Sequence, residues 1–281
     1  EVVIDRRDSH QRQGSDHLDD VVVALRGLTR IDAHPGATSI LWIISHPEVV
    51  TDVELTRGFD LVYAASTPWA AMATERSGRE VRPLLQATDP ARFHPGEPVP
   101  DLTSHALFVG RTRKIFRPIV RDAIEVGADL TIYGDGWGDF IDTSYVRAEH
   151  LSNRDLPDAY RSAQIVLNDH WSDMAELGFL SNRLFDAAAS GALVVTDEVN
   201  GLGDVFGDLV RPYSDVEDLR SLLGPDSTAW ISDEERIEQA RAVGENHSFD
   251  ARALTLLADV LDERGVEHQL RDEQAISPDD A

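Results

Sequence analysis

The chain has 281 residues, of which 26 are lysine or arginine and 51 are aspartate or glutamate, so its formal net charge is −25 and its pI is about 4.6. Such acidity argues against broad binding to nucleic acids or to anionic membranes, because both depend on clustered basic side chains. The absence of cysteine excludes disulfides, thiolate metal sites and cysteine nucleophiles. No apolar run approaches the roughly 20 residues that span a bilayer, and no signal-peptide pattern is present. We therefore expect a cytoplasmic protein without an integral membrane segment.

Short β-branched runs alternate with longer amphipathic stretches, which is the pattern of parallel sheets covered by helices on both faces. In the first hundred residues we predict strands over residues 39–44, 61–65 and 81–84. A helix is predicted over Asp16–Leu28, and another is capped by Ser66 or Thr67 with Pro68 in its first turn. Residues 86–104 hold four prolines and no apolar period, so we predict a linker there.

The same alternation resumes after the linker. Strands are predicted over residues 105–109, 130–133, 164–168 and 193–196 and near Tyr145, and helices over 115–126, 155–162, 181–190, 228–244 and 249–264. The segment after Gly265 is acidic and aperiodic, so we predict a disordered tail. The expected domains are residues 1–100, residues 101–264 and a tail over 265–281. Two doubly wound units joined by a linker predict a ligand in the cleft between them.

Basic residues gather immediately after the strand predicted over residues 105–109. Gly110 permits close backbone approach, and it is followed by Arg111, Arg113, Lys114 and Arg117, of which Lys114 is the only lysine of the chain. One interpretation is a solvated start of a helix. Positive charge at a helix N-terminus opposes the helix dipole, however, and this favours a bound anion such as a diphosphate.

A second candidate segment begins the helix predicted over residues 181–190. Ser181 or Asn182 is suited to the N-cap, and the free amides of a first helical turn bind anions. Asp186 lies one turn beyond Asn182 on the same face, where its carboxylate can accept hydrogen bonds from ribose hydroxyls. The alternative is a surface helix with a good cap.

Several motifs occur in a fixed order along the chain: Phe108-Val-Gly-Arg, Ile132-Tyr-Gly-Asp-Gly-Trp, Ala163-Gln-Ile-Val-Leu-Asn, and Ser181-Asn-Arg-Leu-Phe-Asp-Ala-Ala-Ala-Ser-Gly. The stretch that contains them resembles the nucleotide-binding half of GT-B glycosyltransferases. Within these it is most similar to the CgeB-like (spore maturation protein) group, which has a C-terminal domain of the glycosyl transferases group 1 type. The resemblance implies an α/β GT-B fold, with two Rossmann-like doubly wound domains facing a cleft and a short N-terminal domain.

The resemblance also assigns roles to individual residues. Arg111 and Lys114 would grip the donor diphosphate, Asp186 would bind the ribose, and His46 would contact the transferred sugar, although a turn histidine before Pro47 is the alternative for His46. The implied catalytic residues are His46, Arg111 and Lys114. The implied donor-binding residues are Gly110, Arg111, Lys114, Leu180, Ser181, Asn182, Arg183 and Asp186, and the implied base-binding residues are Gly134, Trp137, Arg147, His150 and Leu151.

Two further observations concern carboxylates and histidine. The superfamily's paired-acid pattern places an earlier carboxylate near Gly178, where this chain has glycine and its nearest acids are Glu176 and Asp173. The resemblance leaves that sugar contact open. Asp169 and His170 follow the strand predicted over residues 164–168, and local hydrogen bonding within a turn is the expected role of this neighbouring pair.

The activity implied is transfer of a sugar from a nucleoside-diphosphate sugar to a hydroxyl acceptor, with retention of configuration. No Asp-x-Asp pair stands where a metal would be held, so neither a metal nor a cofactor is expected. The acceptor, whether a glycan, a lipid-linked molecule or a protein, is not indicated. A degenerate nucleotide-binding GT-B module and a nucleotide-sugar epimerase remain as alternatives.

Overall fold

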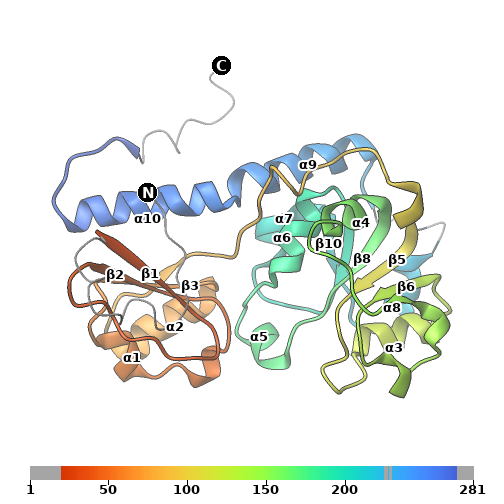
Figure 1. The fold of residues 1–281 in the computed structure, drawn as a ribbon, viewed down its shortest axis with the longest axis horizontal. Coiled ribbons are helices and arrows are strands. Elements are labelled where there is room, and N and C mark those ends of the chain that lie inside the picture. Colours follow the sequence, from red (N-terminus) through yellow and green to blue (C-terminus); the bar gives the residue numbers. More distant parts are fainter. Residues whose placement is uncertain (1–19, 225–226, 228–229, 271–281) are drawn as a thin grey trace. The chain divides into compact units, whose positions relative to one another are not determined.

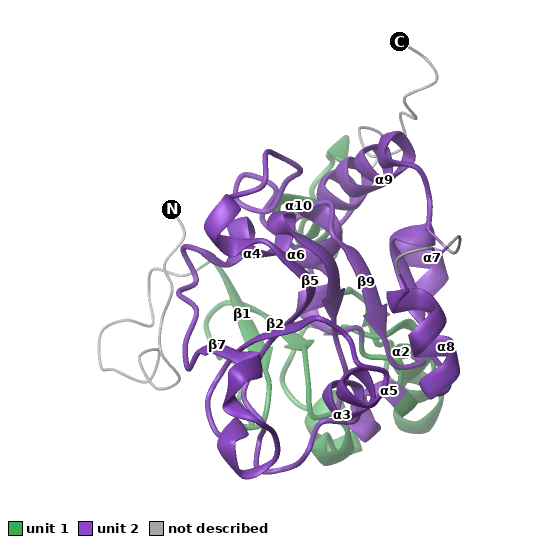
Figure 2. Ribbon diagram, turned by 90° about the vertical axis from the view of Figure 1, so that its right-hand side faces the viewer, with its two compact units in different colours: residues 1–85, 176–179, 250–281 green, residues 86–175, 180–249 purple. Residues whose placement is uncertain are grey.

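The computed structural model describes residues 20–224, 227 and 230–270, and these form two compact units (Figures 1 and 2). Unit 1 contains the described residues up to Leu85, residues 176–179, and those from Asp250 onward. Unit 2 contains residues 86–175 and 180–249. The sequence predicts a boundary at residue 100 and a second domain that extends to residue 264. The structure instead divides the chain after Leu85 and assigns the last helix to unit 1.

Unit 1 is built on a four-stranded parallel sheet in the order β1-β2-β3-β4. Its strands are β1 (Val21–Arg26), β2 (Thr38–Ile43), β3 (Leu61–Ala64) and β4 (Arg82–Pro83). Its helices are α1 (Asp52–Thr56), α2 (Thr67–Ser77) and α10 (Phe249–Glu263), of which α10 belongs to the unit from Asp250 onward. The β2 and β3 side chains are almost wholly buried, as expected for central strands covered on both faces.

The helix predicted over Asp16–Leu28 is wrong. Residues 16–19 lie outside the described residues, and residues 21–26 form β1, which pairs in parallel register with β2 from Val21↔Thr38 to Arg26↔Ile43. Three consecutive valines favour a strand because branching at Cβ restricts the side-chain rotamers. Pairing with β2 then decides between two patterns that the apolar spacing alone does not separate.

Specific contacts attach α10 to the sheet of unit 1. Val260 packs in a cluster with β2 and β3 side chains that includes Trp42. Asp259 is buried, accepts a hydrogen bond from the Tyr63 hydroxyl, and forms an ion pair of 2.9 Å with Arg82. Burial together with the neighbouring Asp259 raises the pKa of Tyr63. These contacts explain why the last helix belongs to unit 1, although 165 residues (84–248) separate it from β4 in sequence.

Unit 2 contains a six-stranded parallel sheet in the order β10-β9-β8-β5-β6-β7. The strands are β5 (Ser104–Val109), β6 (Leu130–Tyr133), β7 (Val146–Ala148), β8 (Ala163–Leu167), β9 (Leu193–Thr196) and β10 (Val210–Pro212). The helices are α3 (Pro118–Glu125), α4 (Leu156–Ser162), α5 (Ser172–Glu176), α6 (Asn182–Ala189), α7 (Leu202–Phe206), α8 (Val216–Leu223) and α9 (Asp233–Asn246). Apart from the strand near Tyr145, the strands predicted after the linker are confirmed within one residue at either end.

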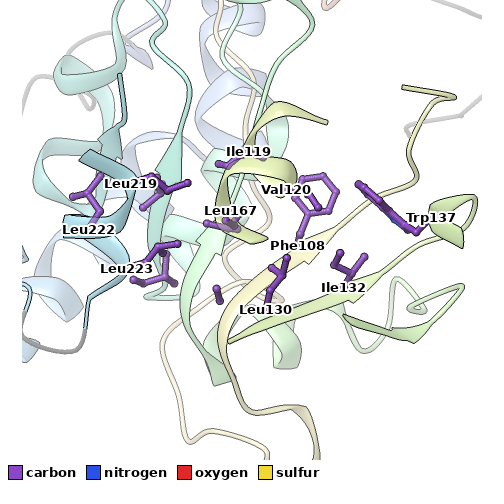
Figure 3. Packing of buried hydrophobic residues seen from close by; sticks show 14 residues of the cluster. Phe108, Ile119, Val120, Leu130, Ile132, Trp137, Leu167, Leu219, Leu222 and Leu223 are labelled. Carbon is purple, nitrogen blue, oxygen red and sulfur yellow. The ribbon is translucent and has the colours of Figure 1, made fainter. Parts of the chain in front are cut away.

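The core of unit 2 shows how helices cover one face of this sheet (Figure 3). Phe108 of β5 and Leu167 of β8 lie in one cluster with Ile119 and Val120 of α3 and with Leu219 of α8. Helix α6 instead packs against α4, α9 and β9. Unit 2 is therefore a doubly wound α/β domain of the predicted class.

Two predicted elements shift. The helix predicted from residue 115 begins at Pro118, because proline disfavours helical conformation in the preceding residue and Arg117 is accordingly extended. Residues 143–145 form a 3-10 turn, and the strand expected near Tyr145 begins at Val146. Residues 228–229 of the predicted helix over 228–244 and residues 271–281 of the predicted tail lie outside the described residues. In the described part of the chain, no helix has the length and apolar character needed to cross a membrane.

Candidate functional site

The strand order of unit 2 has a switch point between β5 and β8. The chain proceeds from β5 outward through β6 and β7, whereas β8, β9 and β10 extend the sheet in the opposite direction. In open parallel sheets, ligands bind beyond the carboxyl ends of the strands at such a point. Gly110 follows β5 and Asn168 follows β8. A ligand site is therefore expected around these two residues.

Arg183 of α6 bridges the two strands at this point. Its guanidinium donates to the Val109 carbonyl oxygen at 2.6 Å and to Asn168 Oδ1 at 3.0 Å, and it lies 5.2 Å from the centre of the Phe108 ring. A planar guanidinium with several fixed donors is suited to such bridging. The predicted donor-binding residue Arg183 is thus at the switch point, where its side chain holds α6 against both strands.

Two glycines allow the turns after β5 and β6 to approach each other. Gly134 has φ of +153°, and a Cβ atom on it would lie 2.1 Å from the Gly110 carbonyl oxygen. That oxygen also accepts a hydrogen bond of 2.9 Å from Trp137 Nε1. Trp137 is buried and packs edge-on against Phe108, so its ring is not exposed for stacking on a base. The predicted base-binding residues Gly134 and Trp137 shape the turn beneath the site.

The basic segment after β5 divides into residues with and without a carboxylate partner. Arg117 is buried and pairs with Asp169, with Nε 2.7 Å from Oδ2. Arg111 is exposed, and its Nε lies 3.3 Å from Asp135. Among the described residues, neither Arg113 nor Lys114 forms a salt bridge. The cluster therefore contains two cations that no carboxylate neutralises by direct contact.

Arg113 and Lys114 also have unusual backbone geometry. Their φ angles are +57° and +64°, in the left-handed region that non-glycine residues rarely adopt. The Arg113 guanidinium lies 4.5 Å from the centre of the Trp171 ring. Partial desolvation, with repulsion from Arg117 and Arg183, lowers the pKa of Arg113. Positive charges held together against their repulsion, on a strained backbone, are a feature of functional sites.

The first turn of α6 has both satisfied and free amides. Ser181 is the N-cap, and its Oγ accepts from the Arg183 amide at 3.3 Å while its carbonyl oxygen accepts from the Leu184 amide at 3.0 Å. The Ser181 amide donates to His170 Nε2 at 2.9 Å. Among the described residues, the amides of Leu180 and Asn182 have no acceptor. The predicted cap is confirmed, and two amides remain available to an anion.

Asp169 and His170 have long-range partners rather than the local turn hydrogen bonds that the sequence predicts. Asp169 pairs with Arg117, as described above, and His170 Nδ1 lies 2.6 Å from Asp197 Oδ1. Asp197 directly follows β9, the neighbour of β8 in the sheet. Polar residues that follow two successive predicted strands were the one sequence signal that could have indicated this pair.

Asp186 lies on α6 one turn after Asn182. Its Oδ1 accepts a hydrogen bond of 2.8 Å from Thr88 Oγ1, and its Oδ2 accepts one of 2.8 Å from Asn182 Nδ2. Burial raises the pKa of Asp186 to about 6, although the two hydrogen bonds oppose the rise. Each carboxylate oxygen has a second lone pair, so both can accept a further hydrogen bond.

Gly178, where the resemblance leads one to look for an acid, has no room for a side chain. It lies in unit 1 with φ of +71°, and a Cβ atom would be 2.6 Å from Pro68 Cγ. On either side of it, Ser66 Oγ donates to the Leu177 carbonyl oxygen at 2.6 Å, and Phe179 packs edge-on against Trp69. The absent acid is therefore a consequence of local packing.

His46 lies in unit 1, two residues beyond the last residue that the sequence assigns to its strand. It has φ of +54°, and its Nδ1 is 3.2 Å from Glu48 Oε1.

The remaining predicted base-binding residues lie on or after β7. His150 and Leu151 follow its carboxyl end, whereas the Arg147 guanidinium donates to Thr103, which precedes β5. Arg147 is thus directed to the amino edge of the sheet.

A family model described as glycosyl transferase-like matches residues 111–258, which is more than half of the chain. The match includes the basic residues from Arg111 onward, the carboxyl end of β8 and the first turn of α6. No curated protein sequence matches the chain.

Several solved structures share the fold. A sucrose-phosphate synthase from Thermosynechococcus elongatus has 14% identity and a TM-score of 0.54, with 82% of this chain and 69% of that one covered. A glycosyltransferase involved in avilamycin A biosynthesis has 19% identity and a TM-score of 0.53, with 85% and 72% covered. The pneumococcal O-GlcNAc transferase GtfA, solved with UDP and GlcNAc, has 12% identity and a TM-score of 0.51. The match covers 82% of this chain but only 53% of GtfA.

Proposed function

Because this chain belongs to the glycosyl transferase-like family and has the GT-B fold, we propose that it moves a sugar from a nucleoside-diphosphate sugar to a hydroxyl acceptor. One observation supports a nucleoside-diphosphate sugar as the donor. Two free amides at the start of α6, those of Leu180 before the N-cap and Asn182 after it, belong to the segment on one side of the β5/β8 switch point. The salt-bridge-free cations Arg113 and Lys114 belong to the segment on the other side. Backbone amides at a helix N-terminus, together with guanidinium groups, are suited to a diphosphate.

The donor diphosphate would take the amides of Leu180 and Asn182 and the side chains of Arg113 and Lys114. Arg111 joins this set by exchanging its exposed contact with Asp135 for a phosphate oxygen, a small loss because exposed ion pairs contribute little. Ser181 and Arg183 fix the turn rather than touch the donor. Gly110 keeps the backbone between the two segments free of side chains.

Asp186 would bind the ribose. It is on the face of α6 one turn from Asn182, and its two oxygens have lone pairs left after their bonds to Thr88 and Asn182. A carboxylate accepts hydrogen bonds from the two vicinal hydroxyls of a ribose, as acidic residues do in dinucleotide-binding folds. His150 and Leu151, after the carboxyl end of β7, are the residues we assign to the base.

In the proposed reaction the acceptor oxygen bonds to the anomeric carbon while the bond from that carbon to the phosphate oxygen breaks. The departing phosphate oxygen takes the acceptor proton, so the products are the glycoside and the nucleoside diphosphate. Negative charge develops on the leaving diphosphate, and preorganised amides and cations stabilise it most at that stage. In this scheme configuration is retained, no enzymic nucleophile is needed, and no divalent metal is required.

The motif series supports the CgeB-like group as the subgroup, and His46 as a contact of the transferred sugar. A nucleotide-binding module without turnover is a second candidate, and the observation in its favour is Gly178, because the position that carries an acid in the paired-acid pattern has no side chain here.

A turnover assay on a panel of nucleotide sugars tests the proposal. The purified protein is incubated with each donor, with and without simple acceptor sugars, and released nucleoside diphosphate is measured. We expect release from at least one donor. Saturable nucleotide binding without release from any donor would select the binding module. Interconversion of the donor sugar without an acceptor, seen by NMR, would select an epimerase. Absence of both binding and release contradicts the proposal.

A further inference from the structure

A chain of hydrogen-bonded polar side chains runs across the carboxyl ends of β8 and β9, and all but that of Asp197, which is 31% exposed, are buried. Asn168 Nδ2 donates to Thr196 Oγ1 at 2.9 Å, and Thr196 Oγ1 donates to Asp197 Oδ1 at 2.9 Å. Asp197 Oδ1 also contacts His170 Nδ1 at 2.6 Å. Asn168 and Thr196 are fully buried, and the His170 side chain is 1% exposed.

Both ends of this chain lie on the first turn of α6. At one end Arg183 donates to Asn168 Oδ1 at 3.0 Å, and at the other end His170 Nε2 faces the Ser181 amide at 2.9 Å. The network is therefore closed: it leaves α6 at Arg183 and returns to the helix at the N-cap. A closed hydrogen-bond network in which most members are buried holds its members in one arrangement.

The directions of the donors determine the state of His170. A backbone amide only donates, so Nε2 must be the acceptor and cannot carry a hydrogen. The other nitrogen, Nδ1, must then carry the hydrogen and donate it to Asp197. His170 is accordingly a neutral imidazole in the Nδ1–H form, and the Asp197 carboxylate fixes that tautomer.

We propose that His170 is a positioning residue for the donor diphosphate: its neutral Nε2 holds the Ser181 amide, and this aims the flanking free amides of Leu180 and Asn182 at the ligand. The inference rests on the proposed function, because it assumes that a diphosphate binds at this turn. Protonation of Nε2 replaces the acceptor with a second donor that faces the Ser181 N–H. The turn must then rearrange, and donor binding weakens under acidic conditions.

Charged and titratable groups of the neighbouring elements lie close to His170. Asp197 contacts the ring directly. Burial raises the pKa of Asp197, but the hydrogen bonds that it accepts from His170 outweigh the burial and lower this pKa overall. Asp169, the preceding residue, is already paired with Arg117. Tyr213, which follows β10, interacts with Asp197, and burial raises its pKa, so it stays neutral. The Arg183 guanidinium joins the network at Asn168 Oδ1 rather than at the imidazole.

Calorimetric titration of the full chain with UDP, GDP, ADP and dTDP tests this inference. In His170→Ala the acceptor is lost, and we expect the dissociation constant of the diphosphate that binds to rise about ten-fold or more. In His170→Gln a side-chain oxygen replaces Nε2 as acceptor, so most of the affinity should return. His94→Ala, which alters an exposed histidine in the same unit, is the matched control and should bind like the wild type.

Two readouts separate positioning from a purely structural role. From pH 7.5 to pH 5.5, the wild type should lose more affinity for the diphosphate than His170→Gln, because the glutamine side chain cannot be protonated. Titration of the ligand itself affects both proteins equally, so it does not contribute to the difference between them. Nitrogen-15 NMR of histidine side chains should show the Nδ1–H tautomer for His170 at pH 7.5, even if His170→Ala fails to fold.

The possible outcomes are distinct. If no diphosphate binds to the wild type, both this inference and the proposed function are overturned. If the wild type binds and folded His170→Ala binds equally well, only the positioning role is overturned. An Nε2–H tautomer or an imidazolium at pH 7.5, or equal pH dependence in the wild type and His170→Gln, also contradicts it.

Discussion

Replacing Asp186 by asparagine should stabilise the protein and, at the same time, weaken donor binding. Burial raises the pKa of this carboxyl from 3.8 to about 6 in the folded chain. Because the folded state binds the proton more tightly than the unfolded state, ionisation of Asp186 destabilises the fold. Stability from this group is greatest below the unfolded pKa and is lost as the pH rises through the folded pKa.

The shift sets the size of the effect. The difference between 3.8 and about 6 corresponds to about 3 kcal/mol when the group is fully ionised. Asp186→Asn removes the buried charge and keeps an oxygen that can accept from Thr88, while the Asn182 amide can rotate to present its own oxygen. The variant should therefore exceed the wild type in unfolding free energy by about 3 kcal/mol at pH 8 and by about half of that at pH 5.

Urea unfolding of both proteins at these two pH values measures the difference. Thr88→Val provides a matched comparison, because it removes one hydrogen bond to the carboxylate without removing the charge, and it should destabilise the chain at pH 8. Weaker nucleoside diphosphate binding by Asp186→Asn would agree with its ribose role. A stability difference that does not change with pH, or a less stable Asp186→Asn variant at pH 8, would refute the reasoning.

Three further predictions follow from the site and its surroundings. Arg113→Ala should weaken nucleoside diphosphate binding about ten-fold or more at an unchanged melting temperature, because it removes a cation that no carboxylate of the described residues neutralises by direct contact. The charge-matched control is Arg241→Ala, which alters an exposed arginine on α9. Equal losses of affinity in the two variants, measured by calorimetric titration, would exclude a direct contact between Arg113 and the diphosphate. Gly178→Ala should lower the unfolding free energy by about 1–3 kcal/mol more than Gly78→Ala. Both glycines have φ near +70°, but only at Gly178 would the added Cβ atom meet a neighbour, Pro68, within 4 Å. Equal urea midpoints for the two variants would contradict this prediction. Sugar transfer should persist in excess EDTA, whereas loss of activity that Mg²⁺ or Mn²⁺ restores would show that the diphosphate requires a metal.

Local patterns in the sequence predicted most of the sheet framework. The runs that became β5, β6, β8 and β9 combine β-branched residues with turn signals at both ends, and such runs are buried central strands in parallel sheets. The cap at Ser181 was also predicted, because hydroxyl side chains at this position satisfy first-turn amides. These features depend on residues close together in the chain.

Features that depend on long-range pairing were not predicted. Residues 21–26 have apolar spacing compatible with either a helix or a strand, and only pairing with β2 selects the strand. The attachment of α10 to unit 1 depends on Asp259 meeting Tyr63 and Arg82. His170 and Asp197 come together because β8 and β9 are neighbours in the sheet, and one sequence does not reveal strand order.

The candidate site shows the same division. The basic segment and the start of α6 were identified from residue type and spacing, whereas the choice among the basic residues required the structure. The basic cluster as a whole, Arg113 included, was predicted to favour a diphosphate, but the resemblance assigned that contact only to Arg111 and Lys114. The structure adds Arg113, which lies beside Arg117 and Arg183 without a salt bridge among the described residues. The resemblance implied Trp137 as a base contact through its place in the loop after β6, but its indole fills the core beneath the turn.

The most direct test of the central claim is the response of individual backbone amides to a bound diphosphate. In a nitrogen-15 TROSY titration with the tightest-binding nucleoside diphosphate, the amide resonances of Leu180 and Asn182 should shift and saturate at the ligand concentrations that saturate binding. The Ser181 amide already donates to His170, so its resonance should shift less. Saturable binding that leaves the Leu180 and Asn182 amides unshifted would place the diphosphate elsewhere and contradict the account.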